Sequence, residues 1–200
     1  MQGRFIVIEG PDGAGTTLHS RLLAERLTAD GVEVILTAEP TDNAIGQGIR
    51  ALLAEGGVGG AALQLLFCAD RAEHVSQVIL PALAEGKTVI TDRYIPSTFA
   101  YGSALGLDIG WLREVNKKFI QPDQTIYLLP PLAVCTERLA RRVSRDMLED
   151  DSLRADVYGA YLQLSESEPD THVIDTSGDK VEASDRIVRI VQEVLAREVA

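Results

Sequence analysis

Eight residues near the N-terminus, GPDGAGTT from Gly10 to Thr17, have the spacing G-x-x-x-x-G-K-[ST] of a phosphate-binding loop in every position but one. Thr16 stands where this motif has its lysine. Glycines let the backbone wrap a phosphate with its N–H groups pointing inward, and the N-terminus of a following helix adds favourable potential. Thr17 occupies the position whose hydroxyl ligates magnesium. The octet alone is equally consistent with an ordinary glycine-rich turn.

An aspartate, Asp92, ends the apolar run VITD and is followed by Arg93. An acid at the end of a buried strand fits the second acidic element of a phosphate-loop enzyme, near the magnesium ion and the attacking oxygen. The alternative is a helix cap or a surface turn, and the nearby phosphate-loop motif makes that alternative less favoured.

A basic segment, ERLARRVSRD at 137–146, stands out in an otherwise acidic chain. Helical spacing brings its four arginines within two turns of each other, which suits a mobile lid that carries guanidinium groups to the transferring phosphoryl group. The simpler alternative is a solvated helix face, the usual meaning of a charge run. The four residues are Arg138, Arg141, Arg142 and Arg145.

Short β-rich runs alternate with longer helical patterns and must position these residues. Strands are expected at 4–10, 32–37, 87–94, 124–129 and 172–176. Helices are expected at 17–29, 44–55, 61–85 with a bend or a restart near Pro81, 97–105, 109–119, 131–142 and 181–199.

This alternation predicts an α/β fold with a five-stranded parallel sheet and helices on both faces, the three-layer fold of P-loop NTPases. Ligands bind beyond the carboxyl ends of the strands in such sheets. Polar residues gather just after four expected strands, in GPDGAGTT, EPTD, DRY and DTS. We expect one domain over residues 1–200, with a short arginine-rich lid at roughly 141–152.

The composition narrows the class of protein. The chain has 200 residues, of which 46% are hydrophobic, and a net charge of -11, so nucleic acid is a poor candidate partner. Cys68 and Cys135 lie in apolar runs without metal-ligand spacing, which indicates buried free thiols in a reducing compartment. No signal peptide or membrane span is apparent, so a cytoplasmic protein without a membrane partner is expected. None of the three histidines has a catalytic or ligand pattern.

With these features in place, the chain resembles thymidylate kinases over nearly its whole length. The stretches that carry the resemblance are FIVIEGPDGAG, TAEPT, GIRALL, LLFCADRAEHV, VITDRY, FAY, QPD with TIYL, and RDMLE. The resemblance implies transfer of the γ-phosphoryl group of ATP to dTMP, giving dTDP and ADP, with Mg²⁺ as cofactor and a homodimer as assembly. The apolar segment around 61–84 could supply the dimer surface, although packing in a monomer core explains the same residues nearly as well.

The resemblance also implies roles for individual residues. Those expected at ATP are Gly10, Asp12, Gly13, Ala14, Gly15, Thr16 and Thr17, with Thr17 and Asp92 at the metal. Phe67 would stack on the pyrimidine and Arg71 would bond the base. Asp12 would receive the 3′-hydroxyl, and Tyr101 would crowd the 2′ position. Arg93 would hold the acceptor phosphate, with Glu39 and Asp92 nearby, and lid residues Arg141 and Arg145 would reach the ATP phosphates.

Simpler readings of three of these residues stay open. Phe67 lies in a segment so apolar that it could be plain core. Arg71 could form a surface ion pair with Glu73, and Tyr101 could serve packing alone.

Three departures from the family pattern lie at ligand-facing positions. Thr16 replaces the loop lysine, Ala38 stands where an arginine is common, and Gly102 follows FAY where glutamine is frequent. One preorganised charged contact is worth on the order of 3 kcal/mol, about a hundredfold in rate, so the loss at Thr16 would slow a kinase without abolishing it. Arg141 or Arg145 is the expected replacement, since a guanidinium reaches far and forks between two oxygens.

Three functions remain to be distinguished. The first is an active thymidylate kinase with compensated chemistry, favoured because Asp12, Thr17, Arg71, Asp92 and Arg93 are all present. The second is a kinase of the same fold acting on another nucleoside monophosphate. The third is a nucleotide-binding protein without turnover.

Overall fold

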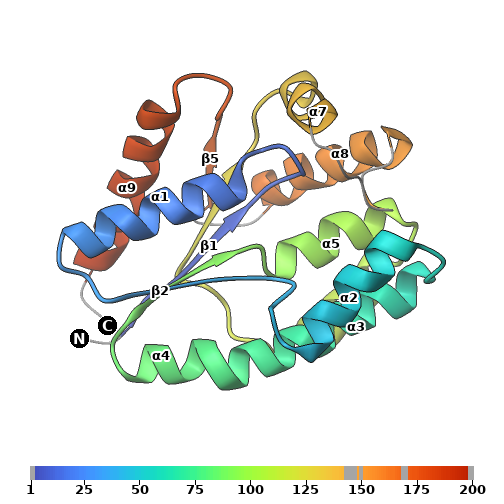
Figure 1. Cartoon of the computed structure of the whole chain (residues 1–200), viewed down its shortest axis with the longest axis horizontal. Helices are drawn as coiled ribbons and strands as arrows, with labels where there is room; N and C mark the ends of the chain where they lie inside the picture. Colours follow the sequence, from blue (N-terminus) through green and yellow to red (C-terminus); the bar gives the residue numbers. More distant parts are fainter. Residues whose placement is uncertain (1–2, 142–147, 149–150, 168–170, 198–200) are drawn as a thin grey trace.

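The computed structural model of this protein describes residues 3–141, 148, 151–167 and 171–197. Strands and helices alternate along the chain (Figure 1). The strands are β1 (Phe5–Glu9), β2 (Val34–Ala38), β3 (Thr88–Asp92), β4 (Gln124–Leu128) and β5 (Thr171–Ile174). The helices are α1 (Thr16–Ala29), α2 (Ala44–Glu55), α3 (Gly60–His74), the π-helix η1 (Val75–Ile79), α4 (Leu80–Ala84), α5 (Ile95–Ala104), α6 (Ile109–Asn116), α7 (Leu132–Ala140), α8 (Asp151–Ser167) and α9 (Lys180–Ala196).

The strands form one parallel sheet in the order β2-β3-β1-β4-β5. Strand β1 is central, with Ile8 opposite Asp92 of β3 and opposite Ile126 of β4. Because all five strands run the same way, the loops that follow them meet at one edge of the sheet. The predicted fold class, a five-stranded parallel sheet in a P-loop NTPase arrangement, is confirmed.

Helices cover both faces of the sheet. Alternate residues of β1 point to opposite faces and therefore pack against different helices. Ile6 and Ile8 pack with apolar residues of α1 and α9. Phe5 and Val7 pack on the other face with residues of α2, α3, α5 and α8. Figure 1 shows α1 and α9 on one side of the strands and α2 to α5 with α8 on the other. None of the helices within the described ranges is long and apolar enough to span a membrane.

One helical segment has the interruption expected for it, and another helix was not expected. In the segment 61–85, α3 ends at His74 and α4 restarts at Leu80, next to Pro81, after the π-helix η1. A proline lacks the N–H of the α-helical ladder, and the wider π-helical turn just before it accommodates that loss. Helix α8 was not anticipated, although Leu153, Val157, Tyr161 and Leu164 recur at helical spacing and pack inside.

Candidate functional site

The glycine-rich loop between β1 and α1 is built to receive an anion. Gly13 and Gly15 have φ of 84° and 94°, a left-handed conformation that favours glycine. A Cβ on Gly13 would also lie 2.6 Å from the carbonyl oxygen of Cys135 in α7. Within the described residues, the backbone N–H groups of Gly13, Gly15, Thr16 and Thr17 find no hydrogen-bond acceptor. Four unpaired N–H groups at a helix N-terminus form an anion site.

Thr17 and Asp92 meet at the mouth of this loop. The Thr17 hydroxyl donates to Oδ2 of Asp92 at 2.5 Å, because β1 and β3 are neighbours that end side by side. The other carboxylate oxygen, Oδ1, is buried and has no partner within the described residues. A buried carboxylate oxygen without a hydrogen-bond donor fits a cation ligand. The described residues hold no group of three or more His, Cys, Asp or Glu side chains that could bind a metal by themselves.

Arg93 follows Asp92 and adopts a positive φ of 73°, which is uncommon outside glycine. Its N–H donates to the carbonyl of Ile8 at 2.9 Å, and its guanidinium turns towards the loop. There it donates to the Gly10 carbonyl at 2.9 Å and to Oδ1 of Asp12 at 2.6 Å. Tyr101 donates to the other oxygen of Asp12 at 2.6 Å.

The buried carboxylate of Glu9 is linked to Arg93 through two hydroxyl groups. Glu9 accepts hydrogen bonds from the backbone N–H groups of Tyr94 and Ser97 at 2.7 and 3.1 Å. It also accepts from the hydroxyls of Ser97 and Tyr161 at 2.8 and 2.9 Å, and both hydroxyls contact Arg93 at 3.2 Å. Burial raises the pKa of Glu9 to about 7, although the Arg93 charge and these hydrogen bonds act to lower it.

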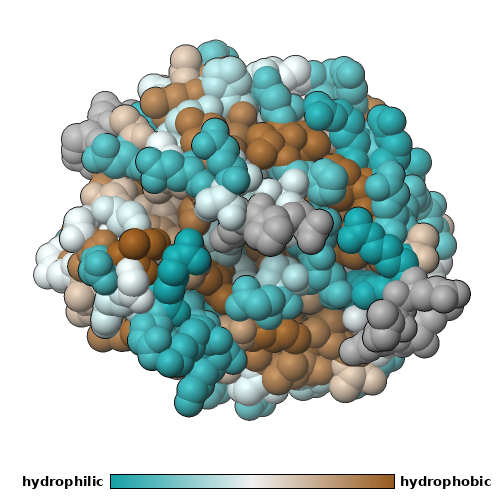
Figure 2. Space-filling view, turned by 180° about the vertical axis from the view of Figure 1, so that it is seen from behind, coloured by the Kyte–Doolittle hydropathy of each residue, from teal (hydrophilic) through white to brown (hydrophobic). Residues whose placement is uncertain are grey.

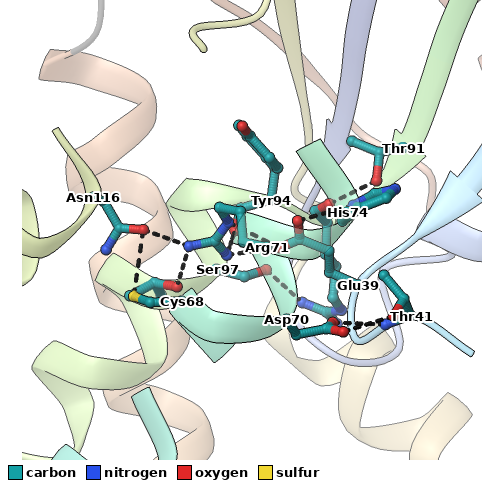
Figure 3. A network of polar contacts seen from close by, with 12 residues as sticks. Glu39, Thr41, Cys68, Asp70, Arg71, His74, Thr91, Tyr94, Ser97 and Asn116 are labelled. Carbon is teal, nitrogen blue, oxygen red and sulfur yellow. Dashed lines mark hydrogen bonds and ion pairs between the residues drawn. The ribbon is translucent and has the colours of Figure 1, made fainter. Parts of the chain in front are cut away.

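Arg71 of α3 is buried, and all five of its N–H donors are used (Figure 3). Its Nε and one terminal nitrogen donate to Oε2 of Glu39 at 2.9 and 2.7 Å. The remaining donors reach the Tyr94 carbonyl at 2.9 Å, Thr98 at 3.1 Å and Asn116 at 2.5 Å. The ion-pair partner of Arg71 is therefore the buried Glu39, and the alternative of a surface pair with Glu73 is wrong.

One cavity joins these groups. It is open to solvent, and its empty volume is about 590 Å³ with the solvent at its opening included. Its lining includes all six residues expected to bind the acceptor nucleotide, as well as Ser97, Thr98 and Leu148. Phe67 is half-buried and faces this cavity, so it is not plain core. The six residues are Asp12, Glu39, Phe67, Arg71, Arg93 and Tyr101.

The arginine-rich segment is only partly described. Arg141 follows the last residue of α7, is exposed and pairs with Glu137 at 2.5 Å. Arg142 and Arg145, like most of the expected lid at 141–152, lie outside the described residues. Of the two arginines of this segment that the structure describes, Arg138 contacts the loop: it donates to the carbonyl of Gly13 at 3.1 Å.

Comparison with known proteins adds a family to this geometry. The family model described as Thymidylate kinase matches residues 8–187. The chain belongs to the thymidylate kinase family. A probable thymidylate kinase of Pyrococcus horikoshii is 41% identical over 204 residues, covering 98% of both chains. A probable thymidylate kinase of Thermococcus kodakarensis is 39% identical over 97% of this chain and 100% of its own. A thymidylate kinase of Exiguobacterium sibiricum is 39% identical over 85% of this chain and 84% of its own.

The structure gives physical context to the departures from the thymidylate kinase pattern. Thr16 is 6% exposed and begins α1, so no basic side chain rises from that position. Ala38 ends β2 and lines a second cavity together with Thr17 and Asp92. At Gly102, a Cβ would lie 2.7 Å from a methyl group of Leu112, which is fully buried. A longer side chain at position 102 would therefore require that core to repack.

Sequence reasoning missed Glu9, Ser97 and Tyr161 as parts of the site, and it assigned Arg138 to the lid segment without its contact to the loop. A signal existed for Glu9, since an acid at the end of the buried run FIVIE needs a partner. No local signal marks Tyr161, because it reaches Glu9 only through the packing of α8 against α5.

Proposed function

We propose that this protein transfers the γ-phosphoryl group of ATP to dTMP, giving dTDP and ADP. The observation that carries the proposal is the cavity beside the phosphate loop that is lined by Asp12, Phe67, Arg71, Arg93 and Tyr101. Its mixed polar and aromatic lining suits a nucleoside monophosphate whose phosphate points at the loop. Membership in the thymidylate kinase family supports dTMP as that nucleotide.

The donor side of the proposal rests on the glycine-rich loop. The four unpaired N–H groups of Gly13, Gly15, Thr16 and Thr17 would bind the phosphates of ATP. Thr17 and Asp92 would hold the Mg²⁺ that accompanies ATP, because they offer a hydroxyl and an unpartnered carboxylate oxygen. Few protein ligands are needed, since Mg²⁺ takes most of its ligands from water and phosphate. When bound, the ion neutralises charge on the phosphates.

On the acceptor side, Arg93 would hold the phosphate of dTMP and Asp12 would receive the 3′-hydroxyl. Phe67 would stack on the pyrimidine, and Tyr101 would crowd the 2′ position. Arg71 would bond the base by exchanging an existing partner, since none of its donors is spare. Thr98 and Asn116 are the neutral side chains that such an exchange would release. Glu39 would then act by holding Arg71 in place.

A lid at roughly 141–152 completes the proposal. Arg141 and Arg145 would swing towards the ATP phosphates when it closes. For Arg141 this requires release from Glu137, a cheap step because exposed ion pairs are worth about 0–1 kcal/mol.

One experiment tests the activity. ADP formation is measured with ATP, Mg²⁺ and a panel of dTMP, dUMP, dCMP, UMP and dGMP, for the protein and for Thr16→Lys. We expect dTMP to be the best acceptor and Thr16→Lys to raise turnover by up to about a hundredfold. Ala38 and Gly102 raised the alternative of a kinase that acts on another monophosphate. That alternative predicts faster turnover with an acceptor other than dTMP. No turnover with any acceptor, while calorimetry still detects ATP binding, would contradict the proposal.

The chain is also proposed to form a homodimer in a reducing cytoplasm. Leu65, Val78 and Leu80 on the continuous segment α3–η1–α4 are 48%, 37% and 46% exposed, although large apolar side chains cost free energy in water. Figure 2 shows such apolar surface as separate patches between hydrophilic residues on one face of the molecule. Cys68 and Cys135 are both free and buried, which suits a reducing compartment.

A further inference from the structure

The phosphate loop lacks a cation at position 16, and the side chains of Arg93 and Arg138 both contact the loop. Arg93 donates to Gly10 and Asp12, and its charge is paired with Asp12. Arg138 of α7 donates to the carbonyls of Gly13 and Ala14 at 3.1 and 3.5 Å. No carboxylate of the described residues forms an ion pair with Arg138. Hydrogen bonds from Ser177 and, to a smaller extent, the charge of Arg138 lower the pKa of Asp175, so this carboxylate offsets part of the Arg138 charge without an ion pair.

The guanidinium of Arg138 faces backbone carbonyls of the loop. Its second terminal nitrogen donates to the carbonyl of Thr176 at 2.6 Å, after β5. The Thr176 hydroxyl donates to the Ala14 carbonyl at 2.7 Å, so Arg138 and Thr176 grip the same peptide unit. A Cβ on Gly15 would stand 3.9 Å from a nitrogen of Arg138, which puts the charge directly behind the residue that precedes Thr16.

Peptide planarity links this contact to an N–H group of the loop. In a trans peptide the C=O of one residue and the N–H of the next point in opposite directions. Fixing the Ala14 carbonyl towards Arg138 and Thr176 therefore aims the Gly15 N–H away from them. That N–H is one of the four without an acceptor among the described residues.

The positive charge of Arg138 also acts on a neighbouring titratable group. His19 of α1 lies 3.5 Å from the position of a Gly15 Cβ. Burial lowers the pKa of His19, and the charge of Arg138 lowers it further. The positive potential of Arg138 thus reaches across Gly15 to the helix that begins at Thr16.

We infer that Arg138 is a positioning residue that supplies, from behind the loop, part of the positive charge that Thr16 lacks. It orients the Gly15 N–H and raises the potential at the site of the donor's polyphosphate. The inference rests on the proposed function only in naming ATP as the donor. Its physical content is the binding of a polyphosphate to the loop.

The test is a charge-rescue cycle. Binding of inorganic tripolyphosphate and of ATP is measured by calorimetry for Arg138→Gln and Arg138→Lys, each with threonine and with lysine at position 16. We expect Arg138→Gln to weaken tripolyphosphate binding about 30-fold with Thr16, and about threefold or less after Thr16→Lys. Arg138→Lys should lose less tripolyphosphate affinity than Arg138→Gln, because lysine keeps the positive charge. Arg26→Gln, the same charge change near the far end of α1, should leave binding unchanged.

The outcomes separate the two proposals. An equal loss from Arg138→Gln with Thr16 and with Thr16→Lys would assign Arg138 a structural role and overturn the inference. A loss seen with ATP but not with tripolyphosphate would assign it to the base and also overturn it. If Thr16→Lys does not fold, an equal loss of tripolyphosphate affinity in Arg138→Gln and Arg138→Lys would overturn the inference. Absence of kinase turnover alongside a positive rescue would contradict the proposed activity while leaving the inference standing.

Discussion

Glu9 and Arg93 are opposite charges in the interior that no direct ion pair joins; two hydroxyls stand between them. Ser97 and Tyr161 each touch both residues. A hydroxyl can accept from the guanidinium and donate to the carboxylate at once, so the arrangement satisfies both charged groups. It also fixes where the Arg93 guanidinium points, because Asp12 and Gly10 hold its other side.

The raised pKa of Glu9 predicts a pH dependence of stability. The pKa is about 7 in the folded protein against an ordinary 4.5, so the folded state binds more protons between these values. The free energy of unfolding therefore falls as pH rises through this window. Glu9→Gln removes this titration, and its amide can donate to the two hydroxyls. Between about pH 5 and pH 8, the free energy of unfolding of the wild type should fall by about 2 kcal/mol more than that of Glu9→Gln. Urea unfolding at each pH measures both values. A difference independent of pH would show that Glu9 keeps an ordinary pKa.

Arg93→Lys should damage catalysis more than folding. A guanidinium offers separate nitrogens to Gly10 and Asp12, whereas an ammonium is one point charge. We expect kcat/KM for dTMP to fall about a hundredfold in steady-state kinetics. Arg113→Lys, at an exposed position on α6, serves as the matched control and should stay within about twofold of wild type. Comparable losses in the two variants would contradict this role.

At the scale of elements, the pair of Arg71 and Glu39 fastens α3 to the loop after β2. Both side chains are buried, with side-chain exposures of 1% and 3%. His74, one turn after Arg71 on α3, contacts the other oxygen of Glu39 at 3.1 Å. Asp70 on the same helix accepts from the N–H and hydroxyl of Thr41 at 2.7 and 2.6 Å. Helix α3 thus sets the wall of the cavity through polar contacts to a loop that has no regular structure of its own.

Glu39→Gln should be strongly destabilising. Removing one partner of a buried ion pair leaves the other charge uncompensated, at a cost of about 3–5 kcal/mol. The double variant Glu39→Gln with Arg71→Met should recover part of this free energy of unfolding, because the orphaned charge is gone. Glu73→Gln, exposed on the same helix, should change it by less than about 0.5 kcal/mol. Equal effects of the two glutamine variants would mean that the buried pair adds no special stability.

At the scale of the whole molecule, the acidic chain and its apolar patches act in opposite directions. A net charge of -11 favours dispersed molecules through mutual repulsion. Exposed Leu65 and Leu80 on the segment α3–η1–α4 favour burial against another surface. The proposed homodimer would place that segment at its interface and leave the phosphate loop, at the carboxyl edge of the sheet, open to nucleotides.

Leu65→Glu should convert the dimer to monomer. A carboxylate on this segment would be desolvated by association and would repel its symmetry mate across a two-fold axis. Size-exclusion chromatography with light scattering should give the mass of a dimer for the wild type and about 21.6 kDa for the variant. Val181→Glu, 58% exposed on α9, is the control and should remain dimeric. A wild-type protein that elutes as monomer would remove the dimer proposal.

Residues adjacent in sequence were the predictable part of the site. The loop at 10–17, the strand that ends at Asp92 and the order of elements all follow from local periodicity and short motifs. The six cavity residues were named from the resemblance to thymidylate kinases, and the structure brings them together. Helix α8 was missed although Leu153, Val157, Tyr161 and Leu164 recur at helical spacing; its packing against the core stabilises it.

The sequence by itself determined the parallel α/β fold, the phosphate loop and the family, because each depends on short-range spacing that the chain carries in full. The tertiary structure decided which partners the charged residues take. Arg71 meets Glu39 rather than Glu73, Glu9 meets Tyr161 across 152 residues, and Arg138 grips Gly13 across 125 residues. Such pairs depend on how β-strand ends and helices converge at one edge of the sheet. Thr16 marked the missing charge in the sequence, and only the fold brought Arg138 behind it.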